Sequence, residues 1–421
     1  MKTYTRYKDS GISWIGKIPE HWERIPFFMV MTPKSECGHS DEELLSVYLD
    51  KGVVKYSDVV EKRTNATSDD KEKYQLVDIG DFVMNNQQAW RGSVGISFHK
   101  GIVSPAYIIL GLSSKFYLKY ANYLLRDQSM VSLYYLCSKG VGSIQRNLVW
   151  NKLRQMPVFI PPLEEQKTIA AYLDKKTEQI NGLVAAKQKQ IELLKEYKQS
   201  LIANAVTKGI NPKAKMKDSG ISWIGKVPEH WECSTLRKHL RFVSDKGHPD
   251  EQLLSVTREQ GVIIRNTESK EENHNVIPSD LSDYKLVKKG QFAINKMKSW
   301  QGSYAVSSYT GIVSPAYYVC DLDFENKEFF SIAIRSKAYV PFFTMYSKGI
   351  RVDQWDLSPI GLKTIPFFIP PKEEQDTIVS FLKKKIESVD TQISSIEKQI
   401  ANLNEYKQSL ISDVVTGKVK V

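Results

Sequence analysis

One stretch of this sequence occurs twice. Residues 8–23 read KDSGISWIGKIPEHWE, and residues 217–232 repeat them with a single difference, a Val in place of an Ile. Two longer-range matches keep the same offset of 209 residues: P-x-F-I-P-P-x-E-E-Q begins at 157 and 366, and EYKQSLI begins at 196 and 405. Solenoid repeats are much shorter, roughly 20 to 50 residues. The chain is therefore two copies of a domain-sized unit.

Each copy divides again at a double proline, Pro161–Pro162 in the first and Pro370–Pro371 in the second. Before the prolines, short apolar runs alternate with Gly, Asn, Asp and Ser, which is typical of a mixed α/β domain. After them, paired glutamates and an apolar periodicity indicate a long helix, with Gly209 and Gly417 as natural stops. We predict four segments: a globular domain at 1–160, a helix at 161–209, a second globular domain at 210–369 and a second helix at 370–421.

The second helix carries an apolar stripe of the coiled-coil kind. Its side chains recur at alternating spacings of three and four residues, with Lys407 as the one polar break: Val379, Leu382, Ile386, Val389, Ile393, Ile396, Ile400, Leu403, Lys407 and Leu410. The first helix keeps much of this stripe, interrupted by Thr177, Lys187 and Lys198. Because such a stripe must be buried, we expect the two helices to pair, although each could instead pack on its own globular domain. The predicted fold is α+β or mixed α/β, with two pseudo-twofold-related globular domains joined by two long antiparallel coiled-coil helices.

The charge balance favours a polyanionic partner. The chain has 59 Lys and Arg against 48 Asp and Glu, a net charge of +11, and both halves are basic. A basic surface that serves only solubility is the alternative. Four widely spaced cysteines exclude a disulfide framework, and no apolar run has the length of a membrane span or signal peptide. We expect a protein that works in the cytoplasm.

Two motifs suggest chemistry without supporting it. The repeated opening contains G-x-x-x-x-G-K, but Ile18 and Val227 follow the lysines where a phosphate-binding loop needs Ser or Thr. The string SPAY at 104 and 314 resembles the N-P-P-Y-type tetrapeptide of amino-group methyltransferases, but it lacks the second proline, and no Gly-rich loop for a methyl donor follows an early strand. The seven histidines show no metal-binding spacing. We expect a non-catalytic protein; the alternative is a diverged DNA adenine methyltransferase acting on its own.

The combination of motifs resembles a known family. Two variable domains, each introduced by D-S-G-I-x-W-I-G-x-x-P-E-H-W and followed by I-P-P-x-E-E-Q and a long helix, are similar to the DNA specificity subunit of type I restriction-modification systems. The resemblance covers essentially the whole chain. It implies that the two globular domains are target recognition domains, each reading one half of a bipartite DNA site, and that the helices form the spacer between them.

The resemblance also implies partners. The helices would dock two methyltransferase (modification) subunits, and restriction (endonuclease and translocase) subunits would join the larger complex. S-adenosylmethionine, ATP and Mg²⁺ would be bound by those subunits, and this chain would bind no cofactor and no metal. A scaffold without affinity for DNA is a further alternative, although the basic globular domains disfavour it.

Positions that differ between the two copies, inside otherwise similar loops, are candidates for reading two different half-sites. The first loop is NNQQAWRGS at 85–93, which corresponds to NKMKSWQGS at 295–303. Asn and Gln suit adenine edges, whereas Lys and Arg suit guanine or phosphate. The predicted DNA contacts in this pair of loops are Asn85, Asn86, Gln87, Gln88, Arg91 and Ser93 in the first copy and Asn295, Lys296, Lys298, Gln301 and Ser303 in the second.

The second pair of loops is SKGVGSIQRN at 138–147 and SKGIRVDQWD at 347–356. The shared S-K-G suits a phosphate contact common to both halves. The predicted contacts are Lys139, Gln145, Arg146, Lys348, Arg351 and Gln354. Each of these residues could instead be an ordinary solvated loop residue. In the opening motif, we expect Trp14, Trp22, Trp223 and Trp231 to anchor the start of each unit by packing.

Overall fold

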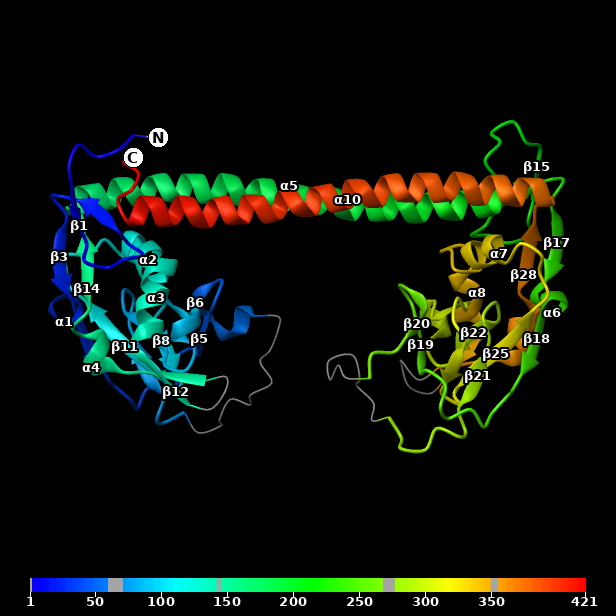
Figure 1. Ribbon diagram of the computed structural model, residues 1–421, viewed down its shortest axis with the longest axis horizontal. Helices are drawn as coiled ribbons and strands as arrows, with labels where there is room; N and C mark the ends of the chain where they lie inside the picture. The colour runs from blue at the N-terminus through cyan, green and yellow to red at the C-terminus, as the bar shows by residue number, and fades with distance from the viewer. Residues whose placement is uncertain (1, 60–70, 142–144, 268–276, 350–354) are drawn as a thin grey trace. The chain divides into compact units, whose positions relative to one another are not determined.

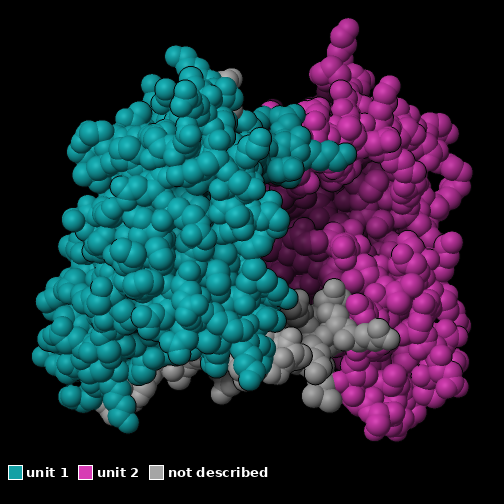
Figure 2. Space-filling view, turned by 60° about the vertical axis from the view of Figure 1, so that its left-hand side comes forward, with its two compact units in different colours: residues 1–188, 398–421 teal, residues 189–397 magenta. Residues whose placement is uncertain are grey.

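The computed structural model describes residues 2–59, 71–141, 145–267, 277–349 and 355–421 (Figure 1). The chain forms two compact units: unit 1 contains residues 1–188 and 398–421, and unit 2 contains residues 189–397 (Figure 2, teal and magenta). Each unit holds a globular part and a segment of each of two long helices, α5 (Leu163–Lys208) and α10 (Lys372–Val415).

The globular part of unit 1 consists of short strands and helices. Its strands are β1 (Tyr7–Asp9), β2 (Lys17–Pro19), β3 (Glu23–Pro26), β4 (Met31–Lys34), β5 (Leu45–Tyr48), β6 (Gly52–Lys55), β7 (Gln75–Val77), β8 (Phe82–Asn85), β9 (Val94–Ile96), β10 (Gly101–Val103), β11 (Tyr107–Leu112), β12 (Ser138–Val141), β13 (Gln145–Leu148) and β14 (Pro157–Ile160). Its helices are α1 (Phe27–Val30), η1 (Tyr56–Asp58), η2 (Ala89–Arg91), α2 (Leu118–Arg126), α3 (Gln128–Leu136) and α4 (Trp150–Leu153).

An antiparallel sheet in the order β4-β11-β8-β9 forms the centre of unit 1. Strand β8 is buried on both faces: Phe82 and Met84 belong to the main core, which includes α2 and α3, and Val83 belongs to a second cluster with β5, β7 and β10. A strand covered on both faces needs an unbroken apolar run. This explains the sequence FVM in β8 and its counterpart FAI (292–294) in unit 2, where the same division between two clusters recurs.

Unit 2 repeats this architecture. Its strands are β15 (Met216–Asp218), β16 (Lys226–Pro228), β17 (Glu232–Thr235), β18 (Leu240–Val243), β19 (Leu254–Thr257), β20 (Gly261–Ile264), β21 (Lys285–Val287), β22 (Phe292–Asn295), β23 (Tyr304–Val306), β24 (Gly311–Val313), β25 (Tyr317–Leu322), β26 (Ser347–Lys348), β27 (Asp356–Leu357) and β28 (Pro366–Ile369). Its helices are α6 (Leu236–His239), η3 (Ser299–Gln301), α7 (Lys327–Ile334), α8 (Val340–Met345) and α9 (Pro359–Thr364). The central sheet order, β18-β25-β22-β23, corresponds to that of unit 1 strand for strand.

Segments of α5 and α10 run antiparallel within each unit. In unit 1, Lys187 Nζ donates to Gln399 Oε1 and Lys407 Nζ donates to Asn181 Oδ1, so the residue number rises along one helix as it falls along the other. In unit 2, Lys198 pairs with Asp390 across the same seam. The lysines that interrupt the predicted apolar stripe are therefore partners across the helix pair, where polar groups fix the register.

The long helices also pack against the globular parts. Leu173 at the start of α5 and Leu410 and Val414 near the end of α10 are buried in the main core of unit 1. In unit 2, Val206 near the end of α5 and Leu382 of α10 occupy the corresponding core. The mixed fold with two long antiparallel helices is confirmed. Both alternatives for burying the stripe are partly realised, because each helix contacts its antiparallel partner and a globular core. The domain boundaries drawn from the sequence stay predictions.

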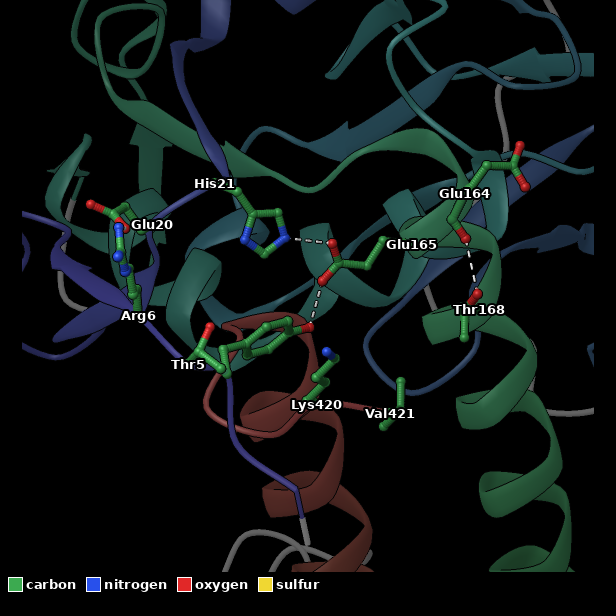
Figure 3. A pocket seen from close by; sticks show the side chains of 10 residues that line it. Thr5, Arg6, Glu20, His21, Glu164, Glu165, Thr168, Lys420 and Val421 are labelled. Carbon is green, nitrogen blue, oxygen red and sulfur yellow. Dashed lines mark hydrogen bonds and ion pairs between the residues drawn. The ribbon is translucent and has the colours of Figure 1, made fainter.

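The two repeated motifs meet at the start of α5. The carboxylate of Glu165 accepts hydrogen bonds from Tyr4 Oη at 2.5 Å and from Trp22 Nε1 at 3.1 Å. Its Oε2 lies 2.7 Å from His21 Nε2 (Figure 3). Trp22 is completely buried. Burial and the hydrogen bond to Glu165 raise the pKa of Tyr4, so its hydroxyl remains a donor. The opening motif therefore fastens the entry of the chain to the helix.

The same arrangement recurs in unit 2, where Glu374 accepts from Trp231 Nε1 at 3.1 Å and lies 2.7 Å from His230. The predicted packing role is confirmed for Trp22 and Trp231. Trp14 and Trp223 are 41% and 42% exposed, so they anchor the chain from its surface: each donates its indole N–H to a backbone carbonyl of its own unit, and the ring of Trp223 lies 4.9 Å from that of Phe342. Within the described ranges, no helix is both long enough and apolar enough to cross a membrane.

Candidate nucleic-acid interface

The two loops predicted in the first copy lie side by side in unit 1. The loop 85–93 connects β8 to β9 through η2, and the hairpin strands β12 and β13 pair Ser138–Val141 with Gln145–Leu148. Leu148 N donates to Asn86 Oδ1 at 2.9 Å and approaches Asn86 O at 3.3 Å. We call the described residues of this loop and hairpin the unit 1 surface. Two segments about fifty residues apart in the sequence therefore form one continuous surface.

Several of the predicted contact residues build this loop instead of facing outward. Asn85 Oδ1 accepts from the backbone N of Gln87 at 3.1 Å, which is a local turn. Ser93 is 1% exposed, and its hydroxyl donates to Val47 O at 3.0 Å. The predicted DNA contact of Ser93 is therefore corrected: its side chain fixes the loop to β5 from inside the fold.

Unit 2 shows the same division of roles in the loop 295–303. Asn295 is 9% exposed and donates through Nδ2 to Tyr317 Oη at 3.3 Å, while Ser303 is 3% exposed. These two contact predictions are corrected for the same reason, burial. Lys296 holds the neighbouring hairpin, because its O accepts from Leu357 N at 3.0 Å and its Nζ lies 3.0 Å from Asp356. Asn86 in unit 1 and Lys296 in unit 2 therefore each bond the loop to the neighbouring hairpin.

The remaining predicted residues include the free cations of these surfaces. Arg91 and Lys139 in unit 1 and Lys298 and Lys348 in unit 2 are exposed, and none forms an ion pair with a described residue. Exposed lysines without an ion pair to a described residue also occur elsewhere on the globular parts, as at Lys17 and Lys226, whereas Lys100 pairs with Glu42 at 2.7 Å. Unpaired cations leave a local positive potential, which suits a phosphate backbone.

The remaining predicted contact residues differ in exposure and in backbone pairing. The side chain of Gln87 is exposed, and those of Gln88 and Gln301 are half-buried. Gln145 pairs with Val141 in the backbone ladder of the hairpin. Arg351 and Gln354 lie outside the described residues.

Aromatic side chains next to these loops were missed by the sequence reasoning. In unit 1 the rings of Trp90 and Tyr135 lie 6.1 Å apart, and Tyr135 is 47% exposed. In unit 2 the rings of Trp300 and Trp355 lie 5.0 Å apart. Exposed rings beside cations are a surface on which bases and guanidinium groups stack. The available signal was the retention of Trp in both copies of an otherwise variable loop.

Unit 1 has a hollow whose lining residues hold the fold together. It has a volume of about 640 Å³ and lies between the chain entry, the start of α5 and the chain end (Figure 3). Its lining mixes cations and carboxylates: Arg6, His21 and Lys420 with Glu20, Glu164 and Glu165. Glu165 is already occupied by the donors described above. We find no arrangement of acid, base and nucleophile in it.

The two motifs that suggest chemistry have structural roles. In the G-x-x-x-x-G-K motif, Ser10 N donates to Gly16 O at 3.0 Å, and Gly11 and Gly16 have φ of 75° and 72°. The motif therefore forms a tight connection between β1 and β2. A phosphate-binding loop would instead open a helix. In the SPAY segment, Tyr107 N donates a hydrogen bond to Ser104 O at 3.1 Å, which closes a turn, and the chain then enters β11. Within the described part of the chain, no group of three or more His, Cys, Asp or Glu could hold a metal ion.

Comparison with known proteins agrees with this geometry. The family described as type I restriction modification DNA specificity domain matches residues 48–193. The type I restriction enzyme MjaVIII specificity subunit of Methanocaldococcus jannaschii is 24% identical over 440 residues, covering 96% of this chain and 94% of the relative. The type I restriction enzyme EcoKI specificity subunit of Escherichia coli is 22% identical over 450 residues, covering 96% and 90%.

The fold likeness also spans the full length. A solved chain from a study of complex assembly and conformational transition of the type I R-M system superposes with a TM-score of 0.65 at 12% identity, covering 96% of this chain and 99% of that one. Residues 48–193 therefore match the type I restriction modification DNA specificity domain, and the chain is similar along nearly its whole length to type I restriction enzyme specificity subunits, with a fold like that of the solved chain.

Proposed function

We propose that this chain recognises a bipartite DNA target, with unit 1 reading one half-site and unit 2 the other. One observation carries the proposal: both units build the same loop-and-hairpin surface, yet the exposed positions on it differ. Gln87 and Arg91 in unit 1 correspond to Met297 and Gln301 in unit 2, while the asparagine that closes the turn of the loop is kept as Asn85 and Asn295. A shared frame with different exposed side chains is what two different half-sites require.

Charge supports the same function. The unpaired Lys139 and Lys348 occupy equivalent places at the start of each hairpin, and the chain carries a net charge of +11. A cation kept in both units suits a contact with phosphate, which positions the protein without reading sequence. The scaffold alternative, which lacks DNA affinity, gives no reason for a cation at the same place of both hairpins.

The chain would act as part of a larger complex. We propose that two methyltransferase subunits dock on α5 and α10, with restriction subunits joining the complex, and that the complex works in the cytoplasm. The helices carry exposed apolar side chains that suit docking, namely Leu183, Leu193, Tyr197 and Tyr406. S-adenosylmethionine, ATP and Mg²⁺ would be bound by the partners.

We propose that the chain itself is non-catalytic. The relatives named above are specificity subunits, so they lend no support to the alternative of an autonomous methyltransferase. Calorimetric titration of the purified full-length chain with S-adenosylmethionine separates the two. A specificity subunit gives no binding heat, whereas a stoichiometric heat would contradict the proposal.

The recognition function is tested by target selection. The full-length chain, reconstituted with its methyltransferase subunits, is given a library of duplexes with randomised bases, and methylated molecules are sequenced. We expect two blocks of preferred bases separated by an unspecified spacer. A single contiguous block, or methylation without base preference, would contradict the proposal.

Paired variants assign each block to a unit. Gln87→Ala with Gln88→Ala should alter base preference in one block only. The matched control, Met297→Ala with Lys298→Ala at the equivalent positions of unit 2, should alter only the other block. Equal loss in both blocks from either pair would show that the two units do not read separately.

A further inference from the structure

Arg91 is held against an aromatic ring at the unit 1 surface. Its guanidinium carbon lies 4.7 Å from the centroid of the Trp90 ring. The indole is itself fixed, because Trp90 Nε1 donates to Gln87 O at 3.0 Å and the ring lies against Tyr135 at an interplanar angle of 55°. Cation–π contact with a fixed ring restricts the arginine to few rotamers before any DNA is present.

The row of side chains continues to a second arginine. The guanidinium of Arg146 lies 4.3 Å from the centroid of the Tyr135 ring, and its Nη2 donates to Ser138 O at 3.3 Å. Arg146 is therefore partly committed to holding the hairpin. Arg91 is exposed and, with respect to the described residues, makes neither a side-chain hydrogen bond nor an ion pair. Of the two arginines, Arg91 has its N–H donors available.

A stacked guanidinium keeps its donors usable. The ring contact occupies the face of the planar group, while its five N–H bonds point outward in the plane. That planar fork fits two acceptors side by side, such as O6 and N7 of guanine in the major groove, or two oxygens of a phosphate. Because the fork is already oriented, less rotamer freedom is lost on binding.

Comparison of the two copies indicates whether Arg91 contacts a base or a phosphate. A phosphate contact carries no sequence information, so both units would keep a cation, as they do at Lys139 and Lys348. At the position of Arg91, unit 2 has Gln301, although the neighbouring tryptophan is kept as Trp300. Gln is uncharged and suits the N6 and N7 edge of adenine. An exchange of Arg for Gln beside an unchanged ring matches a change of base.

We infer that Arg91, oriented by Trp90, specifies a guanine at one position of the half-site read by unit 1, and that Gln301 favours adenine at the corresponding position of the other. Arg91 is the specificity-determining residue and Trp90 is a positioning residue that acts through it. The inference rests on the proposed function, because it requires that unit 1 reads DNA. It adds the identity of one base and the residue that selects it.

The test uses the full-length chain reconstituted with its methyltransferase subunits and the randomised duplex library. In Arg91→Gln, one guanine position of one block should lose roughly 5- to 150-fold of its discrimination, the range of a good bidentate contact. All other positions should stay unchanged. The reciprocal variant Gln301→Arg should introduce a guanine preference at one position of the other block.

Variants of Trp90 test the positioning role. Trp90→Phe keeps an aromatic face and should retain the guanine preference, whereas Trp90→Ala should weaken it at that position only. If Trp90→Ala flattened the whole block, the ring would be supporting the fold of unit 1, and the positioning role would be refuted.

The outcomes distinguish a failure of the Arg91 assignment from a failure of the proposed DNA-recognition function. If the unaltered protein selects no two-block target, the proposed function fails. If it selects two blocks and Arg91→Gln leaves the guanine position unchanged, only the assignment of Arg91 fails. A uniform loss of affinity with the same base preferences would place Arg91 on a phosphate and overturn the inference.

Discussion

Replacing Glu165 with Ala should release the chain entry of unit 1 from the start of α5. The carboxylate accepts from Tyr4 Oη and Trp22 Nε1, and His21 lies against its other oxygen. Trp22 is completely buried, so no water can replace the lost acceptor without a rearrangement. His21 contributes less, because its side chain is 48% exposed.

The magnitude follows from the donors left without an acceptor. A buried donor that loses its partner costs about 1–3 kcal/mol. With one donor fully buried and one partly buried, Glu165→Ala should reduce the local free energy of opening by about 2–4 kcal/mol. Each 1.4 kcal/mol corresponds to about tenfold, so amide hydrogen exchange near Trp22 and in the first turns of α5 should accelerate by roughly 30- to 1,000-fold.

Hydrogen exchange of the full-length chain, read by mass spectrometry of peptides covering 17–26 and 163–172, measures this directly. Glu164→Ala is the matched control, because Glu164 also lies in the first turn of α5. Its side chain is 84% exposed and, among the described residues, pairs only with Lys167, so we expect a change within about 0.5 kcal/mol. Glu374→Ala should act on unit 2 and more weakly, because Lys213 stands where unit 1 has Tyr4.

Two results would refute this reasoning. The first is equal acceleration by Glu164→Ala and Glu165→Ala, which would mean that charge at the helix start matters and the buried hydrogen bonds do not. The second is Glu165→Ala accelerating exchange equally in both units, because the bonds described are confined to unit 1.

Three further outcomes are expected. DNA affinity should fall by roughly 100-fold between 50 and 200 mM salt if about four phosphate contacts are made, and an affinity independent of salt would exclude the proposed use of the unpaired cations. Cys37 and Cys233 should react with a maleimide at pH 8 in the native protein, whereas Cys137 and Cys320 should not, because burial raises the pKa of these two thiols to about 11 and about 12. Mass spectrometry counts the labels, and four labels on the native chain would contradict this prediction. The fragment 1–209 should self-associate, because it contains all of α5 and lacks α10, which covers it; a strictly monomeric fragment on sedimentation would count against the helix pairing.

The architecture was predictable because its signals are local or repeated. The 209-residue offset predicts two equal units, and the double prolines and the glycines bracket α5 and α10 closely. Even the breaks in the apolar stripe carried information, since Lys187 and Lys198 bond across the helix pair. Periodicity depends only on neighbours in sequence, so a single chain reveals it.

The roles of individual loop residues were not predictable in the same way. Ser93 and Gln87 are both polar residues of one short loop, yet the hydroxyl of Ser93 is bonded to Val47 in the core and the side chain of Gln87 is exposed. Whether a loop residue faces inward depends on segments far away in sequence. Trp90 illustrates the same point, because its partner Tyr135 comes from the end of α3 and no local pattern connects them.

The exchange of loop residues between units tests the central claim most directly. The variant Gln87→Met, Gln88→Lys, Arg91→Gln gives unit 1 the side chains of unit 2 at positions 297, 298 and 301 on an equivalent frame. Sequencing of methylated library targets should show one block changed toward the preferences of the other block, and that other block unaltered. An unchanged target, or a change in both blocks, would contradict the claim that each unit reads its own half-site through these residues.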